Sequence, residues 1–191
     1  MEKVMFLVSA GGGTLKYIHR LSSMIGVEVV GVIADRECPA YEYAKEHRIP
    51  GSIVRYYKRS HELDDMIRRL NPDTIITTWH KILNKDTLDL PPEFINLHYS
   101  LLPAMKGAIG MEALQIATEK GCKFVGATLH QVNKDVDEGK IIGQAVMLNA
   151  PGVQDTLFIA ACRLLTSWLQ KSLGHWHEEI NYKQVWFHIM G

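Results

Sequence analysis

The chain has no excess of charge of either sign. Among its 191 residues, 21 are Lys or Arg and 21 are Asp or Glu, so the formal net charge is zero. Such a chain produces no overall field that would hold a polyanion, and binding to nucleic acid or to a membrane surface would need a local basic patch. The composition therefore predicts no nucleic-acid or membrane partner and favours a protein that acts on small molecules.

Cysteine is scarce, and long apolar runs are absent. The three cysteines, Cys38, Cys122 and Cys162, lie far apart and form no Cys-x-x-Cys pair, which disfavours a disulfide framework and a zinc knuckle. No apolar stretch approaches the roughly 20 residues that span a bilayer. The apolar run 4–10 is too short for the core of a secretion signal. We therefore expect a soluble protein of a reducing compartment, the cytoplasm, with no bound metal.

What the sequence contains is a regular alternation of apolar, strand-like segments with amphipathic, helix-like segments. Strands are predicted at 4–9, 27–34, 73–78, 94–97, 124–131 and 141–148, with a short extended piece at 53–54 and an extended tail at 180–189. Helices are predicted at 15–25, 40–47, 62–70, 111–119 and 155–173. This alternation predicts an α/β fold: a single domain over residues 1–191, with a Rossmann-like, mostly parallel sheet and helices on both faces.

A run of glycines follows the first predicted strand. Gly11, Gly12 and Gly13 lead into Thr14, a residue type that caps helices. Backbone N–H groups at such a helix start can hold a phosphate or a carboxylate. The spacing matches neither the dinucleotide fingerprint nor a Walker loop. A tight turn that only lets the helix pack explains the same residues, and the sequence leaves both interpretations open.

A second group of polar residues follows a later predicted strand. Asn96 and His98 are two residues apart at the end of a strand, so their side chains project from the same face. A carboxamide donor beside an imidazole can stabilise an oxyanion and move a proton. Asp137, on an acidic turn closed by Gly139, could accept a hydrogen bond from His98 and favour the protonated imidazole. Taken alone, these residues could equally be structural, and the acidic turn could be simply solvated.

Three motifs together resemble one known family. They read Asn-x-His-x-Ser-Leu-Leu-Pro at 96–103, Gly-x-Thr-x-His at 126–130 and Asp-x-Gly at 137–139. In this order and at this separation they resemble the formyltransferases that use 10-formyltetrahydrofolate. The resemblance spans nearly the whole chain, from the first strand to the last long helix.

The resemblance implies a reaction and roles for three residues. The family's catalytic Asn, His and Asp correspond to Asn96, His98 and Asp137. The implied reaction is direct transfer of the formyl group to an amine, without a covalent intermediate or a metal. Asn96 and protonated His98 would stabilise the oxyanion, and Asp137 would keep His98 charged and help to remove the amine proton.

The resemblance also assigns binding residues. Lys81, Ile82 and Leu83, with Asp135 and Val136, would bind 10-formyltetrahydrofolate, and the glycine loop from Gly11 to Thr14 would bind the acceptor substrate. The implied acceptor is a small-molecule primary amine, and the nearest reaction by architecture is that of the phosphoribosylglycinamide formyltransferases of purine biosynthesis. The protein would be a monomer or a homodimer.

Some segments depart from that member of the family. Trp79 and His80 are unusual in the folate segment, and Lys106-Gly107-Ala108 looks more like the deformylase or tRNA-type members. Two alternatives therefore stay open. One is a formyltetrahydrofolate deformylase-like hydrolase, in which water replaces the amine. The other is a catalytically silent relative that binds folate or a nucleotide.

Overall fold

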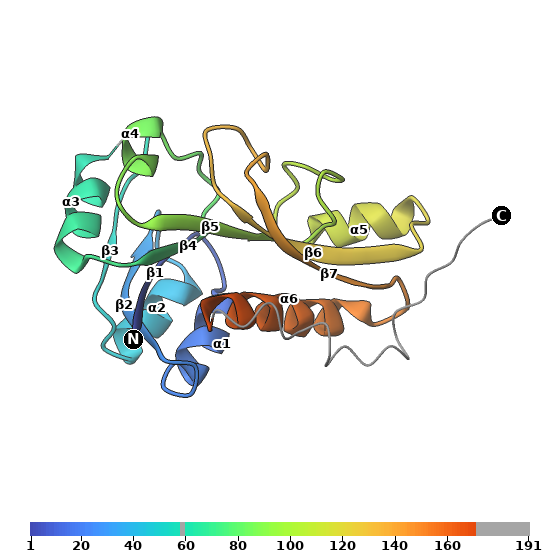
Figure 1. The fold of residues 1–191 in the computed structure, drawn as a ribbon, viewed down its shortest axis with the longest axis horizontal. Coiled ribbons are helices and arrows are strands. Elements are labelled where there is room, and N and C mark those ends of the chain that lie inside the picture. The colour runs from blue at the N-terminus through green and yellow to red at the C-terminus, as the bar shows by residue number, and fades with distance from the viewer. Residues whose placement is uncertain (58–59, 171–191) are drawn as a thin grey trace.

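The computed structural model describes residues 1–57 and 60–170, whose elements form an α/β fold around one sheet (Figure 1). The strands are β1 (Glu2–Val8), β2 (Val27–Ala34), β3 (Gly51–Ile53), β4 (Thr74–Thr78), β5 (Glu93–His98), β6 (Phe124–Gln131) and β7 (Ile141–Leu148). They form a seven-stranded sheet in the order β3-β2-β1-β4-β5-β6-β7. The pairings from β3 to β5 are parallel, whereas β6 is antiparallel to both β5 and β7. The predicted α/β class with a mostly parallel sheet is confirmed.

Helices cover both faces of this sheet. They are α1 (Gly13–Leu21), α2 (Pro39–Glu46), α3 (His61–Leu70), α4 (Lys85–Leu88), α5 (Glu112–Glu119) and α6 (Val153–Leu169). Figure 1 shows α1 and α6 below β5, β6 and β7, with α4 above β4 and β5 on the opposite side. The central strand β1 is buried along most of its length, as a strand between two helical layers must be.

The apolar side chains of β1 alternate between two hydrophobic clusters. Phe6 and its even-numbered neighbours pack with residues of α1, α2 and α6. Met5 and Leu7 pack on the other face, with residues of α3 such as Leu63 and Ile67. Because these side chains are fully buried, each contributes about 2 kcal/mol of hydrophobic stabilisation. The buried core therefore supports the residues that follow the carboxyl ends of the central strands.

Local signals explain where α3 begins and ends. The Ser60 hydroxyl accepts a hydrogen bond from the backbone N–H of Leu63 at 3.3 Å, which caps the first turn. Glu62 and Asp64 lie in the first turn and the last turn is basic, as the helix dipole favours. The helix ends at Leu70, and its C-cap Asn71 adopts the left-handed conformation at φ 45°.

Most predicted elements agree with the structure to within a few residues. The strands predicted at 27–34, 124–131 and 141–148 have these same bounds. The helix predicted at 155–173 begins earlier and ends at Leu169, with Gln170 as its C-cap. The short helix α4 was not predicted. The tail predicted as extended at 180–189 lies outside the described residues.

Candidate active site

A cavity of about 550 Å³ opens where several strands end. Its walls include residues 10–14, which follow β1, residues 77–83 at the end of β4, and residues 96–99 at the end of β5. The chain runs from β1 outward through β2 and β3 and then returns to pair β4 with the other side of β1. Ligands bind at such reversals of strand order in open parallel sheets. The volume is within the range of small-molecule sites.

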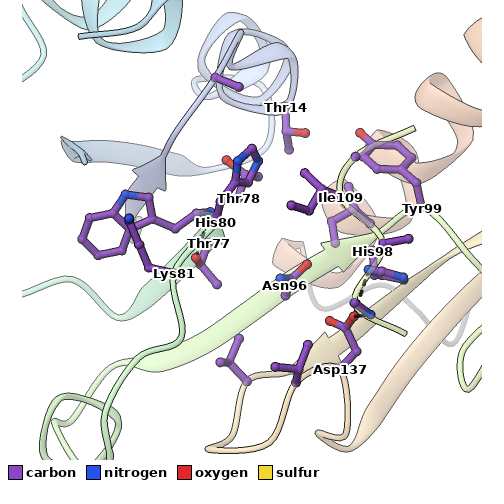
Figure 2. A pocket seen from close by; sticks show the side chains of 18 of the residues that line it. Thr14, Thr77, Thr78, His80, Lys81, Asn96, His98, Tyr99, Ile109 and Asp137 are labelled. Carbon is purple, nitrogen blue, oxygen red and sulfur yellow. Dashed lines mark hydrogen bonds and ion pairs between the residues drawn. The ribbon is translucent and has the colours of Figure 1, made fainter. Parts of the chain in front are cut away.

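The structure brings all the predicted site residues to this one cavity. Its lining includes Gly11, Gly12, Gly13, Thr14, Lys81, Ile82, Leu83, Asn96, His98, Asp135, Val136 and Asp137. Figure 2 shows Asn96 between Thr77, Thr78 and His80 on one side and His98 and Asp137 on the other. The segments are far apart in the sequence, so their meeting is a consequence of the sheet order. The roles assigned to these residues stay predictions.

The glycine loop packs very closely against α2. Gly12 is the N-cap of α1 at φ 68°, and a Cβ atom built on it would lie 2.5 Å from the Cβ of Ala40. The backbone N–H of Ala40 donates to the carbonyl of Ala10 at 3.1 Å. Only glycine fits this position, so the packing interpretation of the loop holds at Gly12. The same loop still borders the cavity, so a ligand-binding role is compatible with it.

The prediction that Thr14 caps α1 is wrong. The N-cap is Gly12, and no side chain caps this helix. Thr14 lies in the first turn, is buried, and is hydrogen-bonded to the side chains of Tyr99 and Cys162. Burial raises the pKa of Tyr99 and that of Cys162 to about 12 each, and the bond to Thr14 opposes it only in part. Because α1 already begins after the left-handed residue Gly12, the Thr14 side chain is not needed as a cap. It binds Tyr99 and Cys162 instead.

Asn96 and His98 lie on β5 and point toward the cavity (Figure 2). His98 is 6% exposed. Its Nδ1 lies 3.4 Å from Oδ2 of Asp137, and its Nε2 lies 3.2 Å from the carbonyl oxygen of Met105. A carboxylate and a carbonyl can only accept hydrogen bonds. Both contacts are therefore hydrogen bonds only when the imidazole carries a proton on each nitrogen.

Asp137 comes from the turn between β6 and β7 and is held by a neighbouring loop. Its Oδ2 accepts a hydrogen bond from the backbone N–H of Gly107 at 2.8 Å. Next to it, Lys106 and Glu138 form an ion pair at 2.8 Å, and hydrogen bonding to Lys106 lowers the pKa of Glu138. The backbone of Asp137 is left-handed, with φ 53°. This conformation costs about 1 kcal/mol, which the surrounding contacts must outweigh.

Thr128 fixes the loop that follows His98. Its hydroxyl donates to the carbonyl of Ser100 at 2.7 Å and accepts from the backbone N–H of Leu102 at 3.0 Å. The side-chain amide of Gln144 donates to the same hydroxyl at 3.0 Å. Thr128 is fully buried, so these bonds are protected from water. The Thr of the Gly-x-Thr-x-His motif thus acts structurally, by holding the loop that carries Met105 and Gly107.

His130 lies beside this group and is also buried. It pairs directly with Asn96 across the antiparallel strands β5 and β6. Its Nδ1 lies 2.8 Å from the carbonyl of Gln131, and its Nε2 lies 3.6 Å from Oδ1 of Asp137. Burial lowers its pKa, and nearby His98 lowers it further, whereas the Gln131 hydrogen bond and Asp137 act in the opposite direction.

Three of the residues predicted to bind folate, Lys81, Ile82 and Leu83, follow β4 and line the cavity. Ile82 is 63% exposed, whereas Leu83 is buried. Lys81 places its Nζ 3.9 Å from Oδ2 of Asp35, at the carboxyl end of β2. Burial would raise the pKa of Asp35, but hydrogen bonds from Arg36 and Ser9 and the charges of Arg36 and Lys81 hold it below its usual range. This side of the cavity therefore combines an apolar surface with a partly neutralised lysine.

Trp79 and His80 occupy different environments. Trp79 is buried, and its ring lies against Tyr56 with centroids 5.2 Å apart. His80 is exposed, and its backbone N–H donates to the hydroxyl of Ser9 at 3.0 Å. Trp79 thus forms part of the wall and of the core behind it.

Sequence reasoning missed several residues that line the cavity. Tyr99, Ile109 and Phe158 are among them, and Phe158 comes from α6, far along the chain. Its ring touches Gly13, where a Cβ atom would lie 3.0 Å from Cε2. The carbonyl of Met105 was also missed. No local pattern identifies a backbone carbonyl or a helix residue as part of a site.

The described part of the chain contains neither a metal-binding cluster nor a membrane-spanning helix. Residues 1–57 and 60–170 hold no group of three or more His, Cys, Asp and Glu side chains placed to bind a metal. In the same ranges, no helix combines the length and the apolar character needed to cross a membrane.

Comparison with known proteins identifies relatives of the chain. A family described as formyl transferase matches residues 2–157. The chloroplastic phosphoribosylglycinamide formyltransferase of Arabidopsis thaliana is 29% identical over 160 residues, covering 76% of this chain and 55% of that protein. The formyltetrahydrofolate deformylase of Corynebacterium sp. (strain P-1) is 31% identical over 161 residues, covering 76% of this chain and 52% of that protein. The chain thus spans about half the length of these curated relatives.

Solved structures agree with this similarity. The crystal structure of glycinamide ribonucleotide transformylase 1 from Symbiobacterium toebii superposes with a TM-score of 0.78 and 25% sequence identity. The match covers 89% of this chain and 86% of that chain.

Proposed function

The chain belongs to the formyl transferase family, and from this premise we propose that it transfers a formyl group from 10-formyltetrahydrofolate to a small primary amine. Members of this family are enzymes, and the reaction of phosphoribosylglycinamide formyltransferase in purine biosynthesis is the nearest by architecture. One observation carries the proposal: Asn96, His98 and Asp137 line the same cavity, with His98 and Asp137 in direct contact.

Asn96 and His98 would act on the oxygen of the formyl group. When an amine adds to the formyl carbon, the carbonyl π electrons move to this oxygen and give it a negative charge. The carboxamide N–H of Asn96 and the Nε2–H of His98 are donors able to stabilise that charge. Such donors, fixed in a partly enclosed site, are worth about 3 kcal/mol each in the transition state.

Asp137 would hold His98 in its charged form and handle the proton of the amine. Its Oδ2 faces Nδ1 of His98, so a proton on that nitrogen is balanced by the carboxylate. The attacking amine must lose a proton after the new C–N bond forms, and Asp137, directly or through water, is the base for it in the proposal. The bond to the folate nitrogen then breaks, and that nitrogen leaves with the electron pair and takes up a proton.

The two ends of the cavity would bind the two substrates. Lys81, Ile82 and Leu83, with Asp135 and Val136, offer backbone groups and an apolar surface for the folate. The backbone N–H groups of residues 11–14 would receive an anionic group of the acceptor. Because the cavity is continuous between these segments, both substrates could lie against Asn96 at once.

Hydrolysis of the same formyl donor is the second candidate. The sequence of residues 106–108 resembles the deformylase members, and this segment contacts Asp137 through the backbone N–H of Gly107. The deformylase relative is also as similar in sequence as the transferase relative. Water would then replace the amine as the nucleophile, and formate would be the product.

One experiment separates these functions. The protein is incubated with 10-formyltetrahydrofolate, with and without glycinamide ribonucleotide, while tetrahydrofolate and formate are measured. Tetrahydrofolate release that depends on the amine, without formate, supports the transferase. Formate release that does not need the amine supports the hydrolase. Folate binding with no turnover of either kind would contradict both and leave the catalytically silent relative.

The remaining parts of the proposal concern the setting of the protein. All three cysteines are free thiols, which suits a reducing compartment such as the cytoplasm. The balanced charge favours small-molecule substrates over nucleic acid. We keep a monomer or a homodimer as the expected assembly, and size-exclusion chromatography with light scattering distinguishes them.

A further inference from the structure

The side of the cavity next to the glycine loop has an apolar surface to which the proposed mechanism gives no role. It is formed by Ile109 and Met111, which lie just before α5, and by Phe158 on α6. We call these three residues the apolar wall. Ile109 is 51% exposed, and Met111 and Phe158 are half-buried, so their side chains leave apolar area open to a ligand. Removal of such area from water favours binding.

Phe158 places this wall beside the start of α1. A Cβ atom built on Gly13 would lie 3.0 Å from Cε2 of Phe158 and 3.1 Å from its Cζ. The Phe158 ring also meets the ring of Tyr17 at 90°, with centroids 6.5 Å apart. Figure 2 shows Ile109 on the side of the cavity where Thr14 lies. The wall therefore borders the end of the cavity proposed for the acceptor.

This end of the cavity has no charged side chain. The lining residues 10–14, 99, 107–111 and 158 include no Lys, Arg, His, Asp or Glu. Within the described part of the chain, Lys81 is the one lysine or arginine of the lining, and it follows β4 on the side proposed for the folate. A phosphate at the glycine loop would therefore meet backbone N–H groups without the Arg or Lys partner that strengthens phosphate recognition.

The hydroxyl groups at this end are already engaged with each other. Thr14 is 5% exposed, and its side chain is hydrogen-bonded to those of Tyr99 and Cys162. Burial raises the pKa of Tyr99 to about 12, so this phenol is neutral near pH 7. A sugar or phosphate would have to replace these bonds, because buried polar groups need partners, whereas an apolar group leaves them intact.

We propose that the acceptor is a primary amine with an apolar body, aromatic or branched aliphatic, and that the apolar wall is the subsite that selects this body. This inference rests on the proposed function, because it names the substrate class of the same transfer. The amine would reach the formyl carbon beside Asn96 while its body lies against Ile109 and Phe158. The reaction is unchanged: the new C–N bond replaces the bond from the formyl carbon to the folate nitrogen, and a proton passes overall from the amine to that nitrogen.

Three amines isolate the contribution of the body. Glycinamide is the smallest of them, and glycinamide ribonucleotide adds a ribose phosphate to it. Phenylalaninamide instead adds a benzyl group and keeps the amine and the carboxamide. Each is incubated with the full chain and 10-formyltetrahydrofolate, and the formylated amine and tetrahydrofolate are measured.

The kinetic readout is kcat/KM for each amine. We expect phenylalaninamide to exceed glycinamide by about twentyfold, because the benzyl group is buried against the wall. The ribose phosphate should add less than about fivefold, as an anion near a helix N-terminus without a cation does. A higher kcat/KM for glycinamide ribonucleotide than for phenylalaninamide would overturn the proposal.

Substitutions in the wall test whether it is the source of this preference. Phe158→Ala and Ile109→Ser should each lower kcat/KM for phenylalaninamide by about tenfold and that for glycinamide by less than about twofold. Ile159→Ala is the matched control, because Ile159 is the next residue of α6, is 43% exposed and is not among the cavity-lining residues. Equal losses for the two amines, or the same loss in the control, would contradict a subsite at the wall.

A binding measurement needs no activity. The products N-formylphenylalaninamide and N-formylglycinamide are titrated into the full chain by isothermal titration calorimetry. The first should bind about tenfold more tightly or better and with the more negative heat-capacity change that apolar burial produces. Phe158→Ala should abolish the difference. Equal Kd values of the two products in the wild type would refute the apolar subsite.

These measurements distinguish two kinds of failure. If the wild type formylates none of the amines, the proposed function fails, while the calorimetry still decides whether the wall binds an apolar group. If glycinamide ribonucleotide is the preferred amine and the two products bind equally, the proposed function stands and the apolar subsite fails.

Discussion

At the scale of single residues, the candidate site depends on donors whose direction is fixed by the strands. Asn96 and His98 leave β5 on the same face because strand residues two apart share a face. Asn96 has Thr77 on one neighbouring strand and His130 on the other. A donor held in this way need not reorganise when charge develops on a substrate.

Replacement of Asn96 is the most direct test of the proposed mechanism. We expect Asn96→Ala to lower kcat by about two to three decades, because one oxyanion donor is lost. Folate binding should change little, since the proposed folate contacts lie elsewhere. Steady-state kinetics and a folate titration measure the two effects. Asn149→Ala serves as the control, because Asn149 follows β7 and is not among the residues that line the cavity; an equal loss in both variants would contradict a specific role for Asn96.

His98 and Asp137 should behave as one unit. Their side chains touch at 3.4 Å, so removing either one removes most of what the pair contributes. We expect His98→Ala, Asp137→Ala and the double variant to lower kcat by similar factors. A double-mutant cycle on kcat measures the coupling. Losses that simply add would show that the two residues act independently.

Stability should depend on pH through two histidines, His130, which is buried, and His19, which is half-buried. Burial lowers the pKa of His130 and that of His19, with His47 lowering the latter further. The unfolded chain therefore binds more protons than the folded chain below the ordinary histidine pKa of 6.5. Stability is fully present above this pH and decreases as the pH falls below it.

Urea unfolding between pH 5 and 8 measures this dependence. His130→Asn should lose less stability than the wild type between pH 7.5 and 5.5. His61→Asn, at an exposed position, should follow the wild type. Unchanged pH dependence in His130→Asn would contradict the lowered pKa.

Sequence reasoning could place the side chains of the site but not its backbone groups. Asn96, His98 and Asp137 are marked by their chemical types and their motifs. The carbonyl of Met105 and the N–H of Gly107 carry no such mark, because every residue has these groups. Their positions depend on a loop whose course is fixed by Thr128 and Gln144, about 20 to 40 residues further along.

At the scale of elements, the close contact of α1 and α2 depends on one glycine. Gly12 combines a left-handed backbone with a distance of only 2.5 Å between the position its Cβ would take and the Cβ of Ala40. Gly26 has nearly the same φ, 69°, but nothing lies within 4 Å of its missing Cβ. The two positions therefore separate backbone strain from steric overlap.

Alanine at these positions should have unequal effects. We expect Gly26→Ala to lower the free energy of unfolding by about 1 kcal/mol, from strain alone. Gly12→Ala should lower it by about 3 kcal/mol, because α2 must also move. Denaturant unfolding of both variants measures the difference. Equal losses would show that the contact with Ala40 adjusts without cost.

Elements were predicted well where apolar periodicity was strong and poorly where it was short. β2, β6 and β7 matched because they are long and bounded by turns. The four-residue helix α4 has no periodicity to detect, and its main signal is the cap from Asn84, which accepts from the N–H of Thr87 at 2.8 Å. The cap predicted at Thr14 failed because tertiary contacts outweighed the local preference.

At the scale of the whole molecule, the sheet order places the cavity. β1 has β2 on one side and β4 on the other, so the loops after β1 and β4 separate and leave room between them. The alternation of elements predicted a sheet of this class, but it could not predict that β6 and β7 join antiparallel. That reversal brings the turn with Asp137 back to β5.

Ligand binding should stabilise the whole fold. The cavity is bordered by segments from both halves of the sheet, so a bound folate would link them. At a concentration of 100 times Kd, a ligand that binds only the folded state adds about 2.7 kcal/mol. For a chain of this size we expect Tm to rise by about 5 to 10 °C. Thermal unfolding with a stable folate analogue tests this, and no shift at saturating analogue would contradict folate binding.

The contact between His98 and the carbonyl of Met105 has a consequence for the site when no substrate is bound. The backbone carbonyl offers Nε2 the same kind of acceptor that a formyl oxygen would offer. In the proposed mechanism, the carbonyl oxygen of Met105 therefore occupies the position at Nε2 that the formyl oxygen of the substrate would take. A formyl oxygen that binds Nε2 must displace this carbonyl, so part of the free energy of substrate binding is used in the exchange.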